Sequence, residues 1–196
     1  MPRFVFVWGL WGLALLIPLV AAVQSPVLAW RQPVYILGGF AGIAGLLLLL
    51  VQPILAAGML PGLSGRMARM AHRATGGLLV AFVVLHVLGL WLTSPPDVVD
   101  ALLFRSPTPF AVWGVAAMWG LFMTAVLARF RRRLHPTVWR RMHTGLALVI
   151  VAGTVVHAVL IEGAMETVTK SLLCVLVLSI TLKVVFDLWR RTSRPR

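Results

Sequence analysis

Six long apolar segments follow one another along this chain and decide what it can fold into. The chain has 196 residues, of which 60% are hydrophobic and only 12% are charged. A soluble domain could not remove so much apolar surface from water, so the segments are expected to lie in a lipid bilayer. Because the apolar runs are long, they predict α-helices and not the short alternating strands of a β-barrel.

A spanning helix needs about 20 predominantly apolar residues, and each segment is close to that length. Together they predict one all-α domain over residues 1–196, a bundle of six transmembrane helices. The first segment admits a second interpretation as a signal peptide, but its length and its tryptophans favour a spanning helix. In the second, Gly38, Gly42 and Gly45 are expected to permit close helix contact. The expected helices cover residues 4–23, 34–51, 68–92, 109–128, 142–161 and 168–189.

Basic residues gather at alternate ends of these segments. The net charge is +13, from 18 Lys and Arg against five acidic residues. On a soluble protein this charge would suggest nucleic acid, but here it follows the pattern of topology signals. Arginine clusters lie at 66–73, 129–141 and 190–196, whereas the opposite side has three basic residues and four of the five acids. The positive-inside rule therefore predicts cytoplasmic termini, in a multi-pass protein of a bacterial inner membrane.

Two of the expected helices carry a histidine near each end. His72 and His86 are 14 residues apart, and His143 and His157 repeat that spacing. Fourteen helical steps fall about 40° short of four full turns, so the histidines of one helix share nearly one face, about 21 Å apart. Two such helices side by side would present two levels of facing imidazoles. The charge bias puts His72 and His143 near the cytoplasmic face and the other two toward the outer face.

Imidazole inside a bilayer is costly and needs a partner. A lone histidine would suggest a hydrogen bond between helices, but two matched pairs favour a bound group. A proton relay would need carboxylates or hydroxyls between the histidines, and the lining is instead largely apolar, with glycines that leave room for a flat ligand. The expected lining residues are Thr75, Gly76, Leu79, Phe82 and Val83 on one helix and Leu146, Ile150, Gly153 and Thr154 on the other. This environment suits a haem with two axial imidazoles, which transfers electrons more readily than it binds oxygen.

Other sites are less consistent with the sequence. A zinc site needs its ligands around one ion, and each level offers two imidazoles. The chain has no CxxCH motif, so a haem would be held without covalent attachment, as haem b. The single cysteine, Cys174, is expected in the core, His135 at the membrane interface, and Lys183 with Asp187 as an ion pair.

The residues around the four histidines resemble those of a known family. HRATGGLLVAFVVLH in the third segment, and RRRLHPTVWRRMH before the fifth, look like the ferric reductase-like transmembrane domain. The resemblance covers roughly Arg66 to Val159 and includes the spacing from Trp139 to His143. It implies an inner haem on His72 and His143 and an outer haem on His86 and His157. The nearby arginines Arg73, Arg140 and Arg141 are candidates for contacts with haem propionates.

The resemblance also implies a function. We expect a b-type cytochrome that carries electrons from a cytoplasmic donor, a flavoprotein reductase or a quinol, to a periplasmic redox protein or ferric iron. No FAD or NADPH domain is expected on this chain, so it would be the electron-transfer subunit of an oxidoreductase. One alternative is the haem-binding membrane subunit of a periplasmic methionine sulfoxide reductase; the complete histidine quartet favours the two-haem interpretation. Another is a non-redox transporter or structural subunit with hydrogen-bonded histidines.

Overall fold

The computed structural model describes residues 2–192, and within them it contains seven α-helices, two short 3-10 helices and no strand. Six of the α-helices are long and apolar enough to cross a membrane. This confirms the predicted all-α bundle of six membrane-spanning helices. The six are α1 Pro2–Val23, α2 Pro33–Ala56, α3 Gly65–Thr93, α5 Ala111–Phe130, α6 Pro136–Leu160 and α7 Thr167–Thr192.

Two predicted boundaries were wrong by several residues. Helix α2 continues through Pro53 to Ala56 instead of ending at residue 51, because its last turn is held by the deeply buried Ile54 and Leu55. Helix α6 begins at Pro136 instead of residue 142. The ring nitrogen Nδ1 of His135 accepts the N–H of Thr137 at 3.4 Å, and a proline suits the first helical position.

A short helix, α4 (Pro95–Leu102), lies between the predicted helices at 68–92 and 109–128, where the sequence predicted no helix. Ser94 precedes it and donates from its hydroxyl to the Asp97 carboxylate at 2.5 Å, while Pro95 occupies the first turn. Only Val98 of this helix is buried. Eight residues, of which the first two are prolines, give too weak a periodic signal for a helix to be recognised from the sequence.

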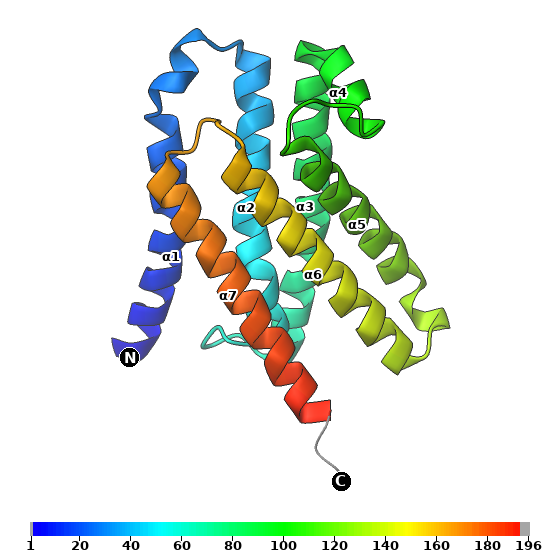
Figure 1. Cartoon of the computed structure of the whole chain (residues 1–196). Coiled ribbons are helices and arrows are strands. Elements are labelled where there is room, and N and C mark those ends of the chain that lie inside the picture. The colour runs from blue at the N-terminus through cyan, green and yellow to red at the C-terminus, as the bar shows by residue number, and fades with distance from the viewer. Residues whose placement is uncertain (1, 193–196) are drawn as a thin grey trace.

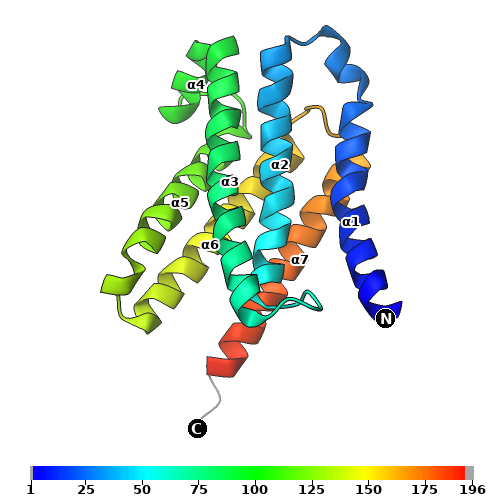
Figure 2. The same cartoon turned by 180° about the vertical axis from the view of Figure 1, so that it is seen from behind.

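The helices are arranged as two antiparallel hairpins with two further helices beside them. Figures 1 and 2 show α2 beside α3 and α5 beside α6, with α7 crossing next to α6 and α1 at the edge of the bundle. Helix α1 begins and α7 ends at the same end of the bundle (Figure 1), which is called here the inner end. The most deeply buried large side chains are Leu50 and Ile54 of α2 and Leu173 and Val177 of α7.

Glycines let each hairpin close tightly. A Cβ on Gly89 of α3 would stand 2.8 Å from the Cα of Gly38 of α2, so the two backbones touch there. A Cβ on Gly153 of α6 would stand 2.8 Å from the carbonyl oxygen of Trp113 of α5. The expected close contact at Gly38 is therefore confirmed, and α5 packs on α6 in the same way.

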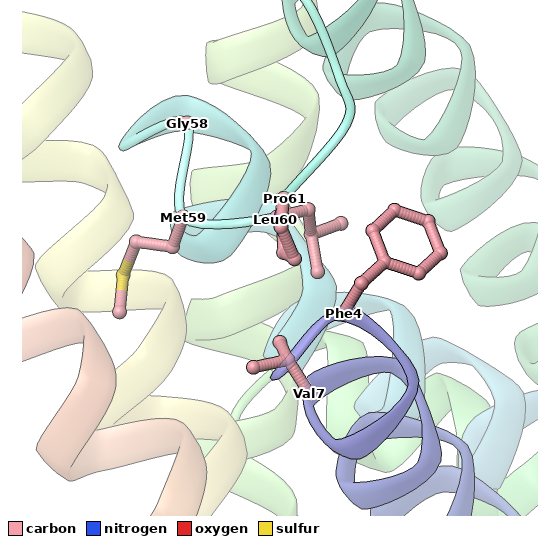
Figure 3. Close-up of a pocket in the computed structure, with 6 residues that line it drawn as sticks. All are labelled: Phe4, Val7, Gly58, Met59, Leu60 and Pro61. Atoms are coloured by element: carbon pink, nitrogen blue, oxygen red, sulfur yellow. The ribbon is translucent and has the colours of Figure 1, made fainter. Parts of the chain in front are cut away.

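A pocket of about 370 Å³ opens at the inner end, between the start of α1 and the loop after α2 (Figure 3). Gly58 and Gly62 turn this loop with positive φ angles of 63° and 83°. The indole of Trp8 donates to the carbonyl of Pro61 at 3.2 Å and ties the loop to α1. The lining residues are Phe4, Val7, Gly58, Met59, Leu60 and Pro61, and none is a histidine.

Candidate functional site

Four histidines meet in two pairs, each with one ring from α3 and one from α6. At the inner level the ring centroids of His72 and His143 are 6.1 Å apart, with the ring planes at 77°. At the outer level the centroids of His86 and His157 are 6.5 Å apart, with the planes at 80°. The two levels of facing imidazoles that the spacing predicted are therefore present.

A main-chain carbonyl and a glycine hold each outer imidazole. The Nδ1 of His86 lies 2.8 Å from the carbonyl oxygen of Gly38, and the residue one turn later on α2 is Gly42. A Cβ at Gly42 would stand only 2.9 Å from that Nδ1. Because glycine has no Cβ, the imidazole of His86 can approach the Gly38 carbonyl oxygen without a steric clash at this position.

His157 repeats this arrangement on the other hairpin. Its Nδ1 lies 2.9 Å from the carbonyl oxygen of Phe110, and the residue one turn later on α5 is Gly114. A Cβ there would stand 2.7 Å from the Nδ1. The ring of Phe110 also meets His157 edge to face, with centroids 5.7 Å apart. The two outer histidines are therefore held in the same way, each by a main-chain carbonyl and by a glycine four residues after it.

The inner level keeps part of this arrangement. Fourteen residues beyond Gly38 on α2 is Gln52, whose carbonyl oxygen lies 3.2 Å from the Nδ1 of His72. Ala56 follows one turn later in place of a glycine. The side-chain amide of Gln52 also donates to the hydroxyl of Thr75 at 2.8 Å. Helices α2 and α3 are therefore joined by polar contacts at the level of His72.

His143 differs from the other three histidines. Its Nδ1 is buried and has no hydrogen-bond partner. Instead the indole of Trp139, one turn earlier on α6, lies against the imidazole with centroids 4.9 Å apart and planes 20° from parallel. The inner pair therefore combines one imidazole fixed by a carbonyl with one that is stacked on an aromatic ring.

The carbonyl contacts fix which ring nitrogen is free. A carbonyl oxygen can only accept a hydrogen bond, so the Nδ1 of each contacting imidazole must carry the proton and donate it. In the neutral ring the lone pair then lies on Nε2. His72, His86 and His157 can accordingly offer Nε2 to a metal ion while Nδ1 donates to a carbonyl, which is the hydrogen bond that ligating histidines usually make.

The separation of the rings suits one metal ion between each pair. With metal–nitrogen bonds of about 2.0 Å, and a ring nitrogen about 1.1 Å from its ring centroid, two imidazoles on opposite sides of one ion would have centroids about 6.2 Å apart. The observed values are 6.1 and 6.5 Å. Within residues 2–192 no three His, Cys, Asp or Glu side chains cluster to hold a metal ion. Two imidazoles alone are too few to enclose a bare ion, so each pair would suit a group that brings further ligands of its own, as a haem does.

The surroundings of the pairs agree only in part with the expected apolar slot. Helices α3 and α6 are not among the closely packed helix pairs. Leu79 and Ile150 are buried in the hydrophobic core. Gly153 was predicted to make room for a flat ligand, but it lies against α5 and serves the contact between α5 and α6. Gly76 faces the side chain of Gln52 at ordinary contact distance.

The remaining predicted residues lie at the inner end or in the core. Arg73, Arg140 and Arg141 are exposed, and Arg73 donates from Nε to the carbonyl oxygen of Arg69 at 3.2 Å. His135 caps α6 and is apart from both pairs, and Cys174 is buried in the core as expected. The Lys183–Asp187 ion pair is confirmed at 2.6 Å.

Sequence reasoning missed the residues that hold the imidazoles. The sequence predicts only helix contact for Gly42, and the predicted second helix ends at residue 51, just before Gln52. Gly114 and Phe110 were not considered. One signal was present: Gly42 and Gly114 occupy equivalent positions on the helices that precede the two histidine helices. The carbonyl partners could not be identified from the sequence, because every residue has a main-chain carbonyl.

Comparison with known families decides the relationship. The model of the family described as ferric reductase like transmembrane component matches residues 39–154, which is more than half of the chain. The chain belongs to this family. The match begins in α2 and ends in α6, so it includes His72, His86 and His143, while His157 lies three residues beyond it. No curated protein and no solved structure matches the chain. Its family makes this multi-pass membrane protein a component of membrane electron transfer.

Proposed function

We propose that this chain is a b-type cytochrome that carries electrons across the bacterial cytoplasmic membrane, with one haem held at each histidine pair. The observation that carries the proposal is the two levels of paired imidazoles, with ring separations of 6.1 and 6.5 Å, in a ferric reductase-like chain. A bound haem would supply an iron that gains and loses one electron. The chain's own residues bind and orient it.

Each pair would hold its haem through the Nε2 atoms of one ring from α3 and one ring from α6. The Nδ1 contacts to Gly38 and Phe110 hold the outer rings. The Gln52 carbonyl holds His72 at the inner level. Such hydrogen bonds orient a ligand and raise its basicity, and losing one typically costs about 10–100-fold in metal affinity. The exposed Arg73, Arg140 and Arg141 lie within three residues of the inner histidines in sequence and would bind propionates there.

The direction of transfer follows from the charge bias. The inner end carries the arginine clusters at 66–73 and 129–141, so under the positive-inside rule it would correspond to the cytoplasm. A cytoplasm-negative potential favours outward electron movement by about 2.3 kcal/mol per 100 mV for a full crossing. The donor would be a cytoplasmic flavoprotein reductase or a quinol, and the acceptor a periplasmic redox protein or ferric iron.

The test is the reduced-minus-oxidised spectrum of the purified full-length chain, together with its haem-to-protein ratio. We expect b-type bands and two haems per chain. A spectrum without these bands would overturn the proposal and favour a non-redox membrane protein. A single haem in the wild type would favour the membrane subunit of a periplasmic methionine sulfoxide reductase.

Variants test the pairing itself. His72→Ala and His143→Ala should each remove the inner haem, and the double variant should remove no more than either alone. His72→Ala combined with His86→Ala should remove both haems, because the two residues belong to different levels. His135→Ala is the matched control, since this exposed histidine only caps α6. Retention of both haems by His72→Ala would exclude that residue as a ligand.

A further inference from the structure

The four imidazoles are not equally supported. Three of them have a main-chain carbonyl oxygen within 3.2 Å of Nδ1, while the Nδ1 of His143 is buried without a partner. An unsatisfied buried polar group of this kind needs a physical explanation. The ring that lies flat against His143 is the indole of Trp139.

The register of the two hairpins identifies the carbonyl that would be the equivalent partner of His143. Moving fourteen residues along α2 leads from Gly38, the partner of His86, to Gln52, the partner of His72. The same step along α5 leads from Phe110, the partner of His157, to Thr124. By this register the Thr124 carbonyl is the counterpart of the other three, yet it makes no hydrogen bond to His143.

The identity of the residue one turn after each carbonyl correlates with the distance between that carbonyl oxygen and the imidazole Nδ1. Glycine occupies this position at both outer carbonyls, where the contacts are 2.8 and 2.9 Å. Alanine occupies it at Gln52, where the contact is 3.2 Å. Alanine also follows Thr124, as Ala128, and there the contact is absent. His143 therefore depends on something other than a carbonyl for its orientation.

We propose that Trp139 is the positioning residue of His143: its stacked indole fixes the plane of this imidazole, as a carbonyl does for each of the other three. Residues four apart on a helix face each other, so α6 itself holds the two rings together. The centroid distance of 4.9 Å and the 20° tilt make a stacked contact that opposes rotation of the imidazole. This inference rests on the proposed function, because it concerns the ligand of the inner haem.

One consequence distinguishes the inner from the outer level. An imidazole that donates from Nδ1 to a carbonyl is a more basic ligand than one that does not. The inner pair therefore has one strengthened ligand, His72, and one held only by stacking, while both outer ligands are strengthened. We expect the inner haem to be the more easily lost of the two.

The test compares Trp139→Leu, which removes the ring, with Trp139→Phe, which keeps an aromatic face. The matched control is Trp119→Leu, because Trp119 of α5 is 51% exposed and meets only Phe122 edge to face among the described ring contacts. For each variant we would measure the haem-to-protein ratio and the reduction potential of each haem. The electron paramagnetic resonance spectrum of the oxidised protein would also be recorded, for the low-field signal of its low-spin ferric haems. That resonance responds to the angle between two axial imidazole planes.

We expect Trp139→Leu to weaken binding of the inner haem by about 10–100-fold, or to shift its resonance and potential where it stays bound, with the outer haem unchanged. Trp139→Phe should restore both properties. A purely structural role would lower thermal stability without moving the signature of the inner haem, and that result would overturn the inference. Trp139→Met, which fills space without a ring, is the second variant if leucine prevents folding. Wild-type protein without haem would contradict the proposed function instead.

Discussion

Gly42 lies directly against the imidazole of His86, with room for a hydrogen atom and no more. A Cβ at this position would stand 2.9 Å from Nδ1 and 3.1 Å from Cε1. Such distances are shorter than carbon and nitrogen atoms tolerate without displacement. The glycine is therefore part of the support for the outer histidine, together with the Gly38 carbonyl that the ring reaches.

Gly42→Ala should displace His86 and break its contact with the Gly38 carbonyl. Because the hydrogen bond from Nδ1 to this carbonyl orients His86, we expect affinity for the outer haem to fall by about 10–100-fold, with the inner haem retained. The haem-to-protein ratio measures this. Gly39→Ala is the matched control, since a Cβ there has no neighbour within 4 Å. Equal haem content in the two variants would contradict the role of Gly42.

Gly114→Ala should give the same result from the opposite hairpin. Its Cβ would stand 2.7 Å from the Nδ1 of His157, so the contact with the Phe110 carbonyl should be lost. Both glycines lie against imidazoles of the outer pair, Gly42 against His86 and Gly114 against His157. A variant carrying both substitutions should therefore lose the outer haem and still keep the inner one. Loss of the inner haem in the double variant would show a general packing defect instead.

Gly89→Ala should destabilise the α2–α3 hairpin without touching a histidine directly. The added Cβ would stand 2.8 Å from the Cα of Gly38, and backbone cannot move aside as a flexible side chain can. Overpacking of this kind typically costs about 1–3 kcal/mol. Thermal unfolding of the detergent-solubilised chain measures the effect. Gly77→Ala, on the same helix with open space around it, should be neutral or stabilising.

Acid should loosen the start of α7 through Glu166. The backbone N–H groups of Thr169 and Val168 donate to this carboxylate at 2.9 and 2.7 Å, and they lower its pKa below the ordinary value of 4.5. The ionised cap therefore contributes stability fully above that value, and the contribution is lost as pH falls through the lowered pKa. Thermal unfolding should show this acid dependence, and Glu166→Gln should reduce it. Glu162→Gln, on the same exposed loop, should leave it unchanged.

Much of the fold and part of the site followed from the sequence. The apolar segments determined six spanning helices, because a bilayer admits little else at that length and composition. The spacing of His72 to His86 and of His143 to His157 determined that each helix carries two imidazoles on nearly one face at two heights, because helical geometry is fixed by the backbone. The family was also recognisable, since its motifs are local stretches of sequence.

Only the tertiary structure decided how the imidazoles are held. The partners of His86 and His157 are carbonyl oxygens 48 and 47 residues away, and main-chain atoms carry no mark in a sequence. Their accessibility depends on Gly42 and Gly114, whose meaning appears only when the neighbouring helices are packed together. The difference between His143 and the other three histidines arose in the same way, because it depends on which atoms the packing of α5 on α6 brings within reach.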